Sequence, residues 1–196
     1  MNYNKTVNHK TIARIIACQP KFQEQLAKLT EQKQPNKNSL ETIIRISNLI
    51  KFQCAPNAKV PPKNHSWTDP KNHTTIQPRG NYGIPCGPIN NLIIFDVDVK
   101  DDGLTELQDY IKNHGDLDTY TVQTATGGLH YYFNYKGANA SDNWLIANYF
   151  KNRAKFRGKG LDIRTSGGYA VGPGSKRNGK AYEVIKNTDI IDMPRS

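Results

Sequence analysis

Two aspartates placed two positions apart carry the clearest chemical signal in the sequence. Asp96 and Asp98 follow the apolar run from Leu92 to Phe95. Because side chains alternate along a strand, both carboxylates are expected on one face, where they repel each other unless a cation lies between them. Mg²⁺ prefers oxygen ligands, and two such ions about 3.5 to 4 Å apart can hold the attacking and leaving oxygens of a phosphoryl transfer. The pair therefore predicts a metal site, with a turn-capping role for one aspartate as the alternative.

A third carboxylate with a neighbouring guanidinium could complete such a site. Asp162 and Arg164 are two positions apart in a strand-like segment, so they are expected on one face. An acidic ligand beside a basic phosphate contact suits a two-metal site, and a plain surface ion pair is the alternative. The glycine-rich segment 167–175 follows at once and ends in Ser175, a candidate donor to a phosphate or a sugar.

A glycine turn followed by a histidine is a further candidate. In Thr124-Ala-Thr-Gly-Gly-Leu-His130, Gly127 and Gly128 let a backbone approach a phosphate closely, and Thr126 and His130 add side-chain donors. An ordinary turn with a surface histidine is the alternative. Alternation predicts two faces for the strand that follows: Leu129, Tyr131 and Phe133 toward the core, His130 and Tyr132 toward a ligand.

Basic residues at every second position indicate contact with a phosphate backbone. An extended segment would present them along one edge, with Phe156 available to stack on a base, while a solvated loop is the alternative. These residues are Lys151, Arg153, Lys155, Arg157 and Lys159. Lys59, Lys63 and Arg79 are secondary candidates for the same contact.

The elements that position these side chains are predicted to be helices near the amino terminus, followed by a mixed sheet. Apolar spacing predicts two short helices within 9–34 and a third within 38–50, and residues 55–81, rich in Pro, Asn and Lys, predict an irregular stretch. Strand-like segments follow, interrupted by one helix at 104–112 that Asp102 caps and Gly115 ends. The predicted strands are 82–86, 92–99, 119–124, 129–135, 161–165, 169–172 and 181–185, with a hairpin or tight connection after the first and a further helix at 144–150. This order predicts an α+β fold.

Composition favours a soluble, intracellular protein with a polyanionic partner. The 196 residues include 27 Lys and Arg against 17 Asp and Glu, a formal charge of +10. The longest apolar stretch is too short to span a membrane, and the polar start lacks an apolar secretory core, so no membrane partner is expected. Cys18, Cys54 and Cys86 lack close Cys or His neighbours, so they are predicted to be reduced thiols and no zinc is expected.

Taken in order, five segments resemble the primase-polymerase family of the archaeo-eukaryotic primase superfamily. The segments are Tyr82-Gly-Ile-Pro-Cys-Gly87, Ile94-Phe-Asp-Val-Asp98, Thr126-Gly-Gly-Leu-His130, Leu161-Asp-Ile-Arg164 and Gly168-Tyr-Ala-Val-Gly-Pro-Gly-Ser175. The resemblance implies an archaeo-eukaryotic primase fold, in which an RNA-recognition-motif-like catalytic sheet packs on a second small α/β unit. It covers 55–196 as the catalytic domain and leaves 1–54 as an amino-terminal helical extension, and the chain could be part of a larger replication protein.

The resemblance also implies residue roles. Asp96, Asp98 and Asp162 match the family's metal-binding acids, which hold two Mg²⁺ or Mn²⁺ ions. The Thr126-Gly-Gly turn with His130 matches the element that binds the triphosphate of the incoming nucleotide, and Arg164 and Ser175 fall in the family's third shared stretch. The implied activity is template-directed nucleotidyl transfer that makes primers or extends DNA. The implied partners are a single-stranded DNA template, a primer, nucleoside triphosphates and a helicase, either as a domain or as a separate protein.

Two other functions stay open on sequence grounds. A haloacid-dehalogenase-like phosphatase also carries its nucleophile in a D-x-D at the end of an apolar strand, but it leaves the glycine turn and His130 unexplained. A replication-associated module that binds single-stranded DNA without catalysis is the other alternative.

Overall fold

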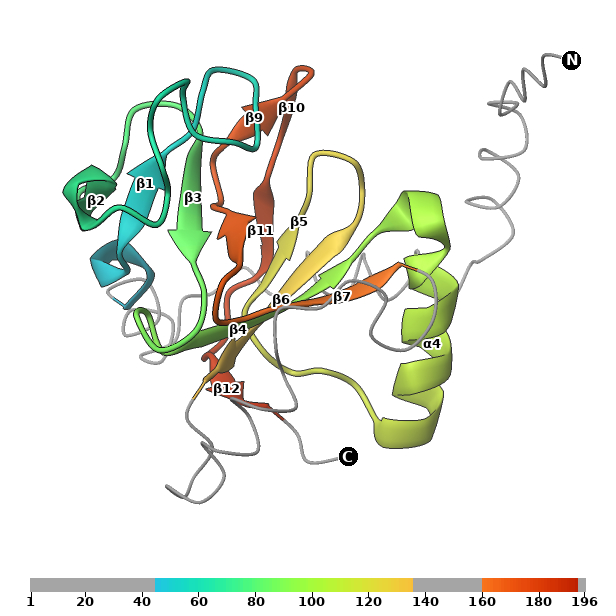
Figure 1. Ribbon diagram of the computed structural model, residues 1–196. Helices are drawn as coiled ribbons and strands as arrows, with labels where there is room; N and C mark the ends of the chain where they lie inside the picture. Colours follow the sequence, from blue (N-terminus) through green and yellow to red (C-terminus); the bar gives the residue numbers. More distant parts are fainter. Residues whose placement is uncertain (1–44, 136–159, 194–196) are drawn as a thin grey trace, which may run out of the picture. The chain divides into compact units, whose positions relative to one another are not determined.

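An apolar run buried on both faces forms β4 (Leu92–Val97), the strand that carries Asp96. Its alternate side chains face two hydrophobic cores: Leu92 and Ile94 the first core, Ile93, Phe95 and Val97 the second core. A strand covered on both faces needs apolar residues at successive positions, which is why the sequence reads as a continuous run. The computed structural model describes residues 45–135 and 160–193 (Figure 1).

β4 lies in the larger of two main sheets. The strand order is β11-β5-β6-β4-β7, with β12 beside β6. β12 pairs with β6 in parallel, and the other pairs of this sheet are antiparallel. The remaining strands are β5 (Thr121–Gln123), β6 (Leu129–Asn134), β7 (Leu161–Arg164), β11 (Glu183–Lys186) and β12 (Ile191–Asp192).

A smaller antiparallel sheet has the order β2-β1-β3-β8. Its strands are β1 (Lys51–Gln53), β2 (His73–Thr74), β3 (Tyr82–Pro85) and β8 (Tyr169–Val171). A separate hairpin joins β9 (Lys176–Arg177) to β10 (Lys180–Ala181). Its turn residues Asn178 and Gly179 have φ angles of 50° and 77°, the left-handed conformation that a two-residue hairpin turn requires.

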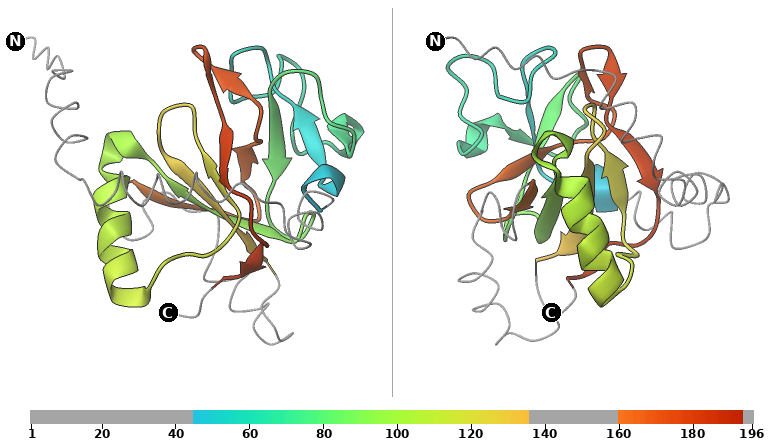
Figure 2. Two further views of the ribbon diagram at one scale, coloured as in Figure 1. Left: turned by 180° about the vertical axis from the view of Figure 1, so that it is seen from behind. Right: turned by 90° about the vertical axis from the view of Figure 1, so that its right-hand side faces the viewer.

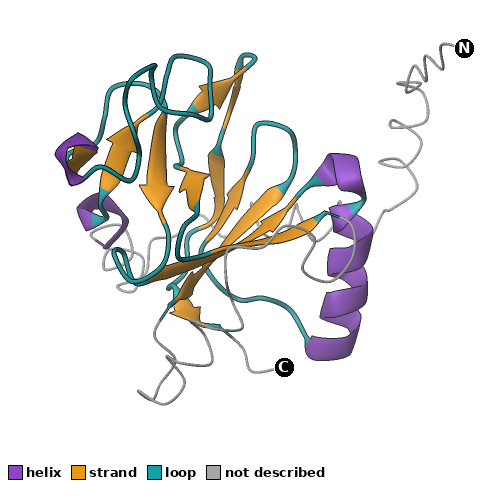
Figure 3. Cartoon of the chain, in the orientation of Figure 1, coloured by secondary structure: helices purple, strands orange, loops and turns teal. Residues whose placement is uncertain are grey.

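Both sheets contribute side chains to the first core. Tyr82 and Ile84 of the smaller sheet meet Ile94 and Tyr132 of the larger sheet there. The helix α4 (Gly103–His114) supplies buried Leu107 to the second core, on the other face of the larger sheet (Figure 2). Two short 3-10 helices, η1 (Pro70–Asn72) and η2 (Val99–Asp101), lie in the loops before β2 and after β4. Strands and loops dominate the described residues, a sheet-rich arrangement compatible with α+β (Figure 3).

Most predicted elements from 82 onward are confirmed. α4 corresponds to the helix predicted at 104–112 and ends at Gly115, while Asp102 stands at its start without a side-chain bond to the helix backbone. β3 and β4 meet through a tight connection with a single bridge between Gly87 and Leu92, and they then diverge into different sheets. Tyr132 does not face a ligand as predicted, because it is fully buried in the first core.

The amino-terminal side of the chain differs from the prediction at one described point. A helical stretch covers 45–48, but the chain enters the smaller sheet at Lys51, inside the segment predicted as a helical extension. The two helices predicted within 9–34 and the helix at 144–150 lie outside the described residues. The described residues all belong to the unit Pro35–Ser196. Among these residues, no helix combines the length and apolarity needed to cross a membrane.

Candidate functional site

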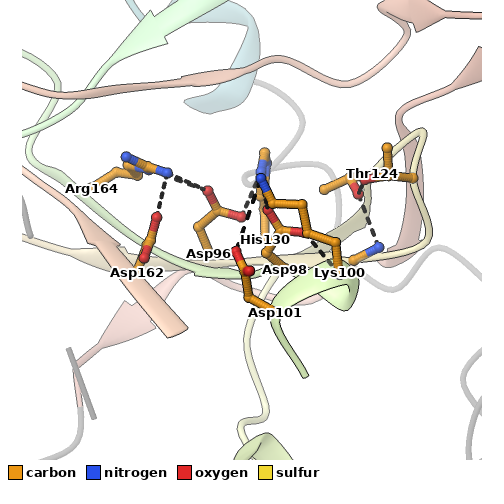
Figure 4. A network of polar contacts seen from close by, with 10 residues as sticks. Asp96, Asp98, Lys100, Asp101, Thr124, His130, Asp162 and Arg164 are labelled. Atoms are coloured by element: carbon orange, nitrogen blue, oxygen red, sulfur yellow. Dashed lines mark hydrogen bonds and ion pairs between the residues drawn. The ribbon is translucent and has the colours of Figure 1, made fainter. Parts of the chain in front are cut away.

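Three neighbouring strands bring Asp162, Asp96 and His130 into one row. Asp96 of β4 is the direct register partner of Asp162 on β7 and of His130 on β6. Directly opposite residues of adjacent antiparallel strands project from the same face, so the three side chains stand side by side (Figure 4). The structure therefore brings together three residues that span 66 positions of the sequence, from 96 to 162.

Arg164 connects the two aspartates of this row. Its Nη2 donates to Asp96 Oδ2 at 3.0 Å and to Asp162 Oδ2 at 2.7 Å, and its Nε donates to Asp96 Oδ2 at 3.2 Å. On the other side, His130 Nε2 lies 3.4 Å from Asp96 Oδ1. The guanidinium supplies the positive charge that two adjacent carboxylates need, so it occupies the electrostatic role of a cation in this cluster.

The electrostatics of Asp96 follow from these neighbours. Burial raises the pKa of its carboxyl, but the charge and hydrogen bonds of His130 and Arg164 outweigh burial and hold the pKa well below its usual range. For Arg164, burial lowers the pKa, and Asp96 and Asp162 reverse that effect so that the net pKa is raised. Asp96 is thus an ionised acceptor at neutral pH although its side chain is only 19 % exposed.

Asp98 stands just beyond β4, where the strand turns into η2. Its Oδ1 accepts a hydrogen bond from the Lys100 backbone at 3.2 Å, and its Oδ2 lies 3.7 Å from Lys100 Nζ. Its backbone is fixed by bonds from its N–H to Gly160 O at 2.7 Å and from Gly103 N–H to its carbonyl at 3.0 Å. Asp98 therefore caps a turn, and its side chain, 36 % exposed, remains accessible.

The backbone N–H groups of the glycine turn before His130 already donate hydrogen bonds to Thr124, within the same turn. Gly127 N–H donates to Thr124 O at 2.9 Å, and Gly128 N–H donates to Thr124 Oγ1 at 3.0 Å. Gly127 has a φ of 88°, and a Cβ on Gly128 would lie 2.2 Å from Val97 O, so both positions require glycine for the fold itself. The contact of these two glycines with a phosphate stays a prediction.

A pocket of about 350 Å³ lies over this row of side chains. The larger sheet and its turns contribute Asp96, Asp98, Thr124, Thr126, His130 and Arg164 to its lining. Tyr169, from the smaller sheet, and Trp67 line it as well, with ring centroids 5.2 Å apart. Lys59 and Val60 also line it, so the irregular stretch 55–81 forms part of the pocket.

His130 has a second, unused polar atom. Its side chain is only 6 % exposed, and Nδ1 has no hydrogen-bond partner among the described residues. A buried imidazole nitrogen without a partner costs free energy unless a ligand or water completes it. Nδ1 of His130 is therefore a buried polar atom whose hydrogen-bonding capacity is unused among the described residues.

Some predicted site residues lie elsewhere. Asp162 reaches the pocket residue Arg164, but it does not itself line the pocket. Ser175 is fully buried, and its Oγ accepts a hydrogen bond from the Tyr82 backbone at 3.2 Å, so its hydroxyl supports the smaller sheet. The basic run Lys151, Arg153, Lys155, Arg157 and Lys159 lies outside the described residues.

Sequence reasoning missed Trp67, Tyr169 and Tyr182 as pocket residues. Tyr182 lines the pocket, and its ring centroid lies 5.9 Å from that of His130. Trp67 stands in an irregular stretch whose path no periodicity predicts. In the glycine-rich segment 167–175, Gly167 and Gly168 line the pocket, and the contact of this segment with a phosphate or a sugar stays a prediction.

The donor atoms of this site suit a hard divalent cation. Carboxylate oxygens of Asp96 and Asp98 line the pocket, and oxygen is the ligand type that Mg²⁺ and Mn²⁺ prefer. Within 45–135 and 160–193, no three His, Cys, Asp or Glu side chains stand close enough to enclose a metal by themselves. The guanidinium bridge between Asp96 and Asp162 shows that cationic charge fits between these carboxylates.

The fold and the site define a sheet-rich α+β protein with a carboxylate, imidazole and guanidinium cluster in a pocket. The family model described as bifunctional DNA primase/polymerase, N-terminal, matches residues 19–196. The chain belongs to this family. A comparison with curated proteins found no match to the chain.

Proposed function

We propose that this chain is a template-directed nucleotidyltransferase that extends DNA and makes primers, with the pocket at Asp96 as its active site. The observation that carries the proposal is the row of His130, Asp96 and Asp162 on three adjacent strands, because it sets an anion-binding group beside paired carboxylates. The family match supports the same activity class.

The residues of the site have the following roles in this proposal. Asp96 and Asp98 hold Mg²⁺ or Mn²⁺, and Asp162 contributes when Arg164 turns from it toward a phosphate. When bound, the two ions lower the pKa of the attacking 3′-hydroxyl and neutralise the departing pyrophosphate. His130 and Thr126, which both line the pocket, donate to the triphosphate. Trp67 and Tyr169 offer aromatic faces on which a base can stack.

Incorporation on a primed, single-stranded template tests the proposal. We expect extension by the parent chain with Mg²⁺ or Mn²⁺, and a loss on the order of a thousand-fold for Asp96→Asn/Asp98→Asn, since the carboxylates contribute several kcal/mol to the transition state. The unprimed template in the same assay measures primer synthesis, and parallel sets of ribonucleotides and deoxynucleotides define the substrate.

A matched control removes one surface carboxylate elsewhere. Asp109 is exposed on α4, so Asp109→Asn should extend like the parent. Normal extension by the Asp96/Asp98 double variant would sink the proposal. His130→Ala should instead raise the apparent KM for the nucleotide more than it lowers kcat.

The two alternatives predict different products. A phosphatase would hydrolyse a simple phosphate ester without template, and a non-catalytic module would bind single strands without incorporation. The family match favours the transferase over the phosphatase.

A further inference from the structure

The hairpin β9–β10 is tied to the loop at 55–60 by side-chain amides. Asn81, itself buried, donates through Nδ2 to Ala58 O at 3.0 Å and to Lys176 O at 2.6 Å, and its Oδ1 accepts from Lys176 N–H at 2.7 Å. At the hairpin tip, Asn178 N–H donates to Asn57 Oδ1 at 2.6 Å. These bonds hold two distant chain segments side by side, as Figure 1 shows.

This tied pair of segments is strongly basic. Five cationic residues lie on these segments or within two positions of Asn81, and we name them the hairpin surface: Lys59, Arg79, Lys176, Arg177 and Lys180. Arg177 is half-buried and the other four are exposed. None of the five forms an ion pair with a carboxylate among the described residues, and the segment 173–182 contains no acidic residue. Cations gathered without counter-charges favour a polyanionic partner.

The hairpin surface continues into the pocket. Lys59 belongs to both, because it lines the pocket together with Asp96. Tyr182 follows β10 directly and also lines the pocket, so the hairpin leads along the chain into the pocket wall. A chain of phosphates bound on the hairpin surface would therefore lead directly to the candidate active site.

The opposite charge prevails in the segment that runs from the site through α4. From 96 to 118, the acidic residues are Asp96, Asp98, Asp101, Asp102, Glu106, Asp109, Asp116 and Asp118, and the basic residues are Lys100 and Lys112. Lys186 Nζ offsets part of this charge, 2.7 Å from Asp118 Oδ1 and 3.8 Å from Asp116 Oδ2, but the excess of carboxylates still repels a polyanion, whereas the hairpin surface attracts one. This charge distribution predicts that a bound nucleic-acid strand approaches the pocket from the hairpin surface.

We propose that the hairpin surface binds the single-stranded nucleic-acid template and leads it into the pocket. The proposal rests on the proposed function, because it names the surface that holds the substrate of that same site. It is also independent of the basic run at 151–159, which is outside the described residues.

Salt-dependent binding of the full chain to a labelled single-stranded oligonucleotide tests the proposal. The test variant Arg177→Gln/Lys180→Gln removes two cations that face each other across the hairpin and keeps the Asn178-Gly179 turn. For a single strand, each lost phosphate contact makes the plot of log K against log salt less steep by about 0.7. We therefore expect the magnitude of the slope to fall by about 1.4 in this variant. Binding at 0.1 M salt should be roughly 20-fold weaker than in the parent.

The control is Lys112→Glu on α4, an exposed site, because it changes the net charge by the same two units. It should bind within about two-fold of the parent. Parent-like binding by the hairpin variant, an equal loss in Lys112→Glu, or a parent chain that binds no single strand would each overturn the proposal. Thermal unfolding of both variants verifies that the fold is intact. If the parent binds through the hairpin but incorporates no nucleotide, the proposed function fails while the template surface stands.

Discussion

At the scale of single residues, Asp96 is the point on which the site depends. Its carboxylate accepts from Arg164 on one side and faces His130 on the other, so it shares its charge with groups from two neighbouring strands. Charge-assisted hydrogen bonds of this kind contribute about 1.5 to 3 kcal/mol each, and removing one partner leaves the other buried and unpaired. The same carboxylate thus stabilises the sheet and is available to a metal.

The low pKa of Asp96 makes the free energy of unfolding depend on pH. Because the folded pKa lies below the unfolded value of about 3.9, this stabilisation is complete above that value and is lost as pH falls toward the folded pKa. We expect Asp96→Asn to be less stable than the parent at pH 7, and the difference to shrink below about pH 4. Urea unfolding at a series of pH values without divalent metal measures it.

Asp109→Asn serves as the control for this effect, because Asp109 is exposed on α4. Its unfolding free energy should follow that of the parent at every pH. Parallel curves for Asp96→Asn and the parent down to pH 3 would show that Asp96 is not a stabilising carboxylate.

At the scale of elements, the close crossing of the backbone at Gly103 over the backbone at Gly160 positions Asp98. A Cβ on Gly103, at the start of α4, would lie 2.3 Å from Gly160 O, the same carbonyl that accepts from Asp98 N–H. Gly160 in turn has a φ of 82° and directly precedes β7. The end of β4, the start of α4 and the start of β7 therefore meet at a place that only glycines allow.

Gly103→Ala tests this crossing, because the substitution has two physical effects that act in opposite directions. Alanine is favoured over glycine in a helix by about 1 kcal/mol, but here its methyl group would push against backbone that cannot yield without shifting Asp98. We expect the substitution to lower the free energy of unfolding by about 1 to 3 kcal/mol and to reduce incorporation further. Denaturant unfolding measures the first effect and primer extension the second.

The control for this substitution is Asp109→Ala, which introduces alanine at an exposed position of the same helix. It should change stability by less than about 0.5 kcal/mol. A stabilised Gly103→Ala variant would mean that the crossing has room for a side chain.

Local sequence patterns predicted the elements that carry the site, but not how those elements pair. Alternation in β4 and β7 placed Asp96 and Asp162 on strand faces, and the apolar run and Gly115 predicted β4 and α4. No local pattern shows that β4 lies between β6 and β7, because pairing between distant strands depends on tertiary packing. The β9–β10 hairpin was detectable, since Asn178-Gly179 is a strong hairpin signal.

At the scale of the described fold, the site depends on both sheets. Asp96, His130 and Arg164 come from the larger sheet, Tyr169 comes from the smaller sheet, and Lys59 and Trp67 come from the irregular stretch. Sequence reasoning predicted the larger-sheet residues, because strand alternation acts locally. It named Lys59 only as a secondary candidate for a phosphate contact and did not predict Trp67, because the place of both in the pocket depends on the path of a stretch without periodicity.

Because the carboxylates come together only in the folded chain, a bound divalent ion should stabilise the fold. Binding to the folded state alone at a concentration of 100 times Kd adds about 2.7 kcal/mol, which corresponds to an increase in Tm of roughly 5 to 10 °C for a chain of this size. We expect Mn²⁺ or Mg²⁺ to raise the Tm of the parent and a chelator to reverse the increase. Asp96→Asn/Asp98→Asn should show no increase, while Asp109→Asn should respond like the parent. An equal increase in the double variant would place the stabilising ion elsewhere, since Asp96 and Asp98 are the carboxylates that line the pocket among the described residues.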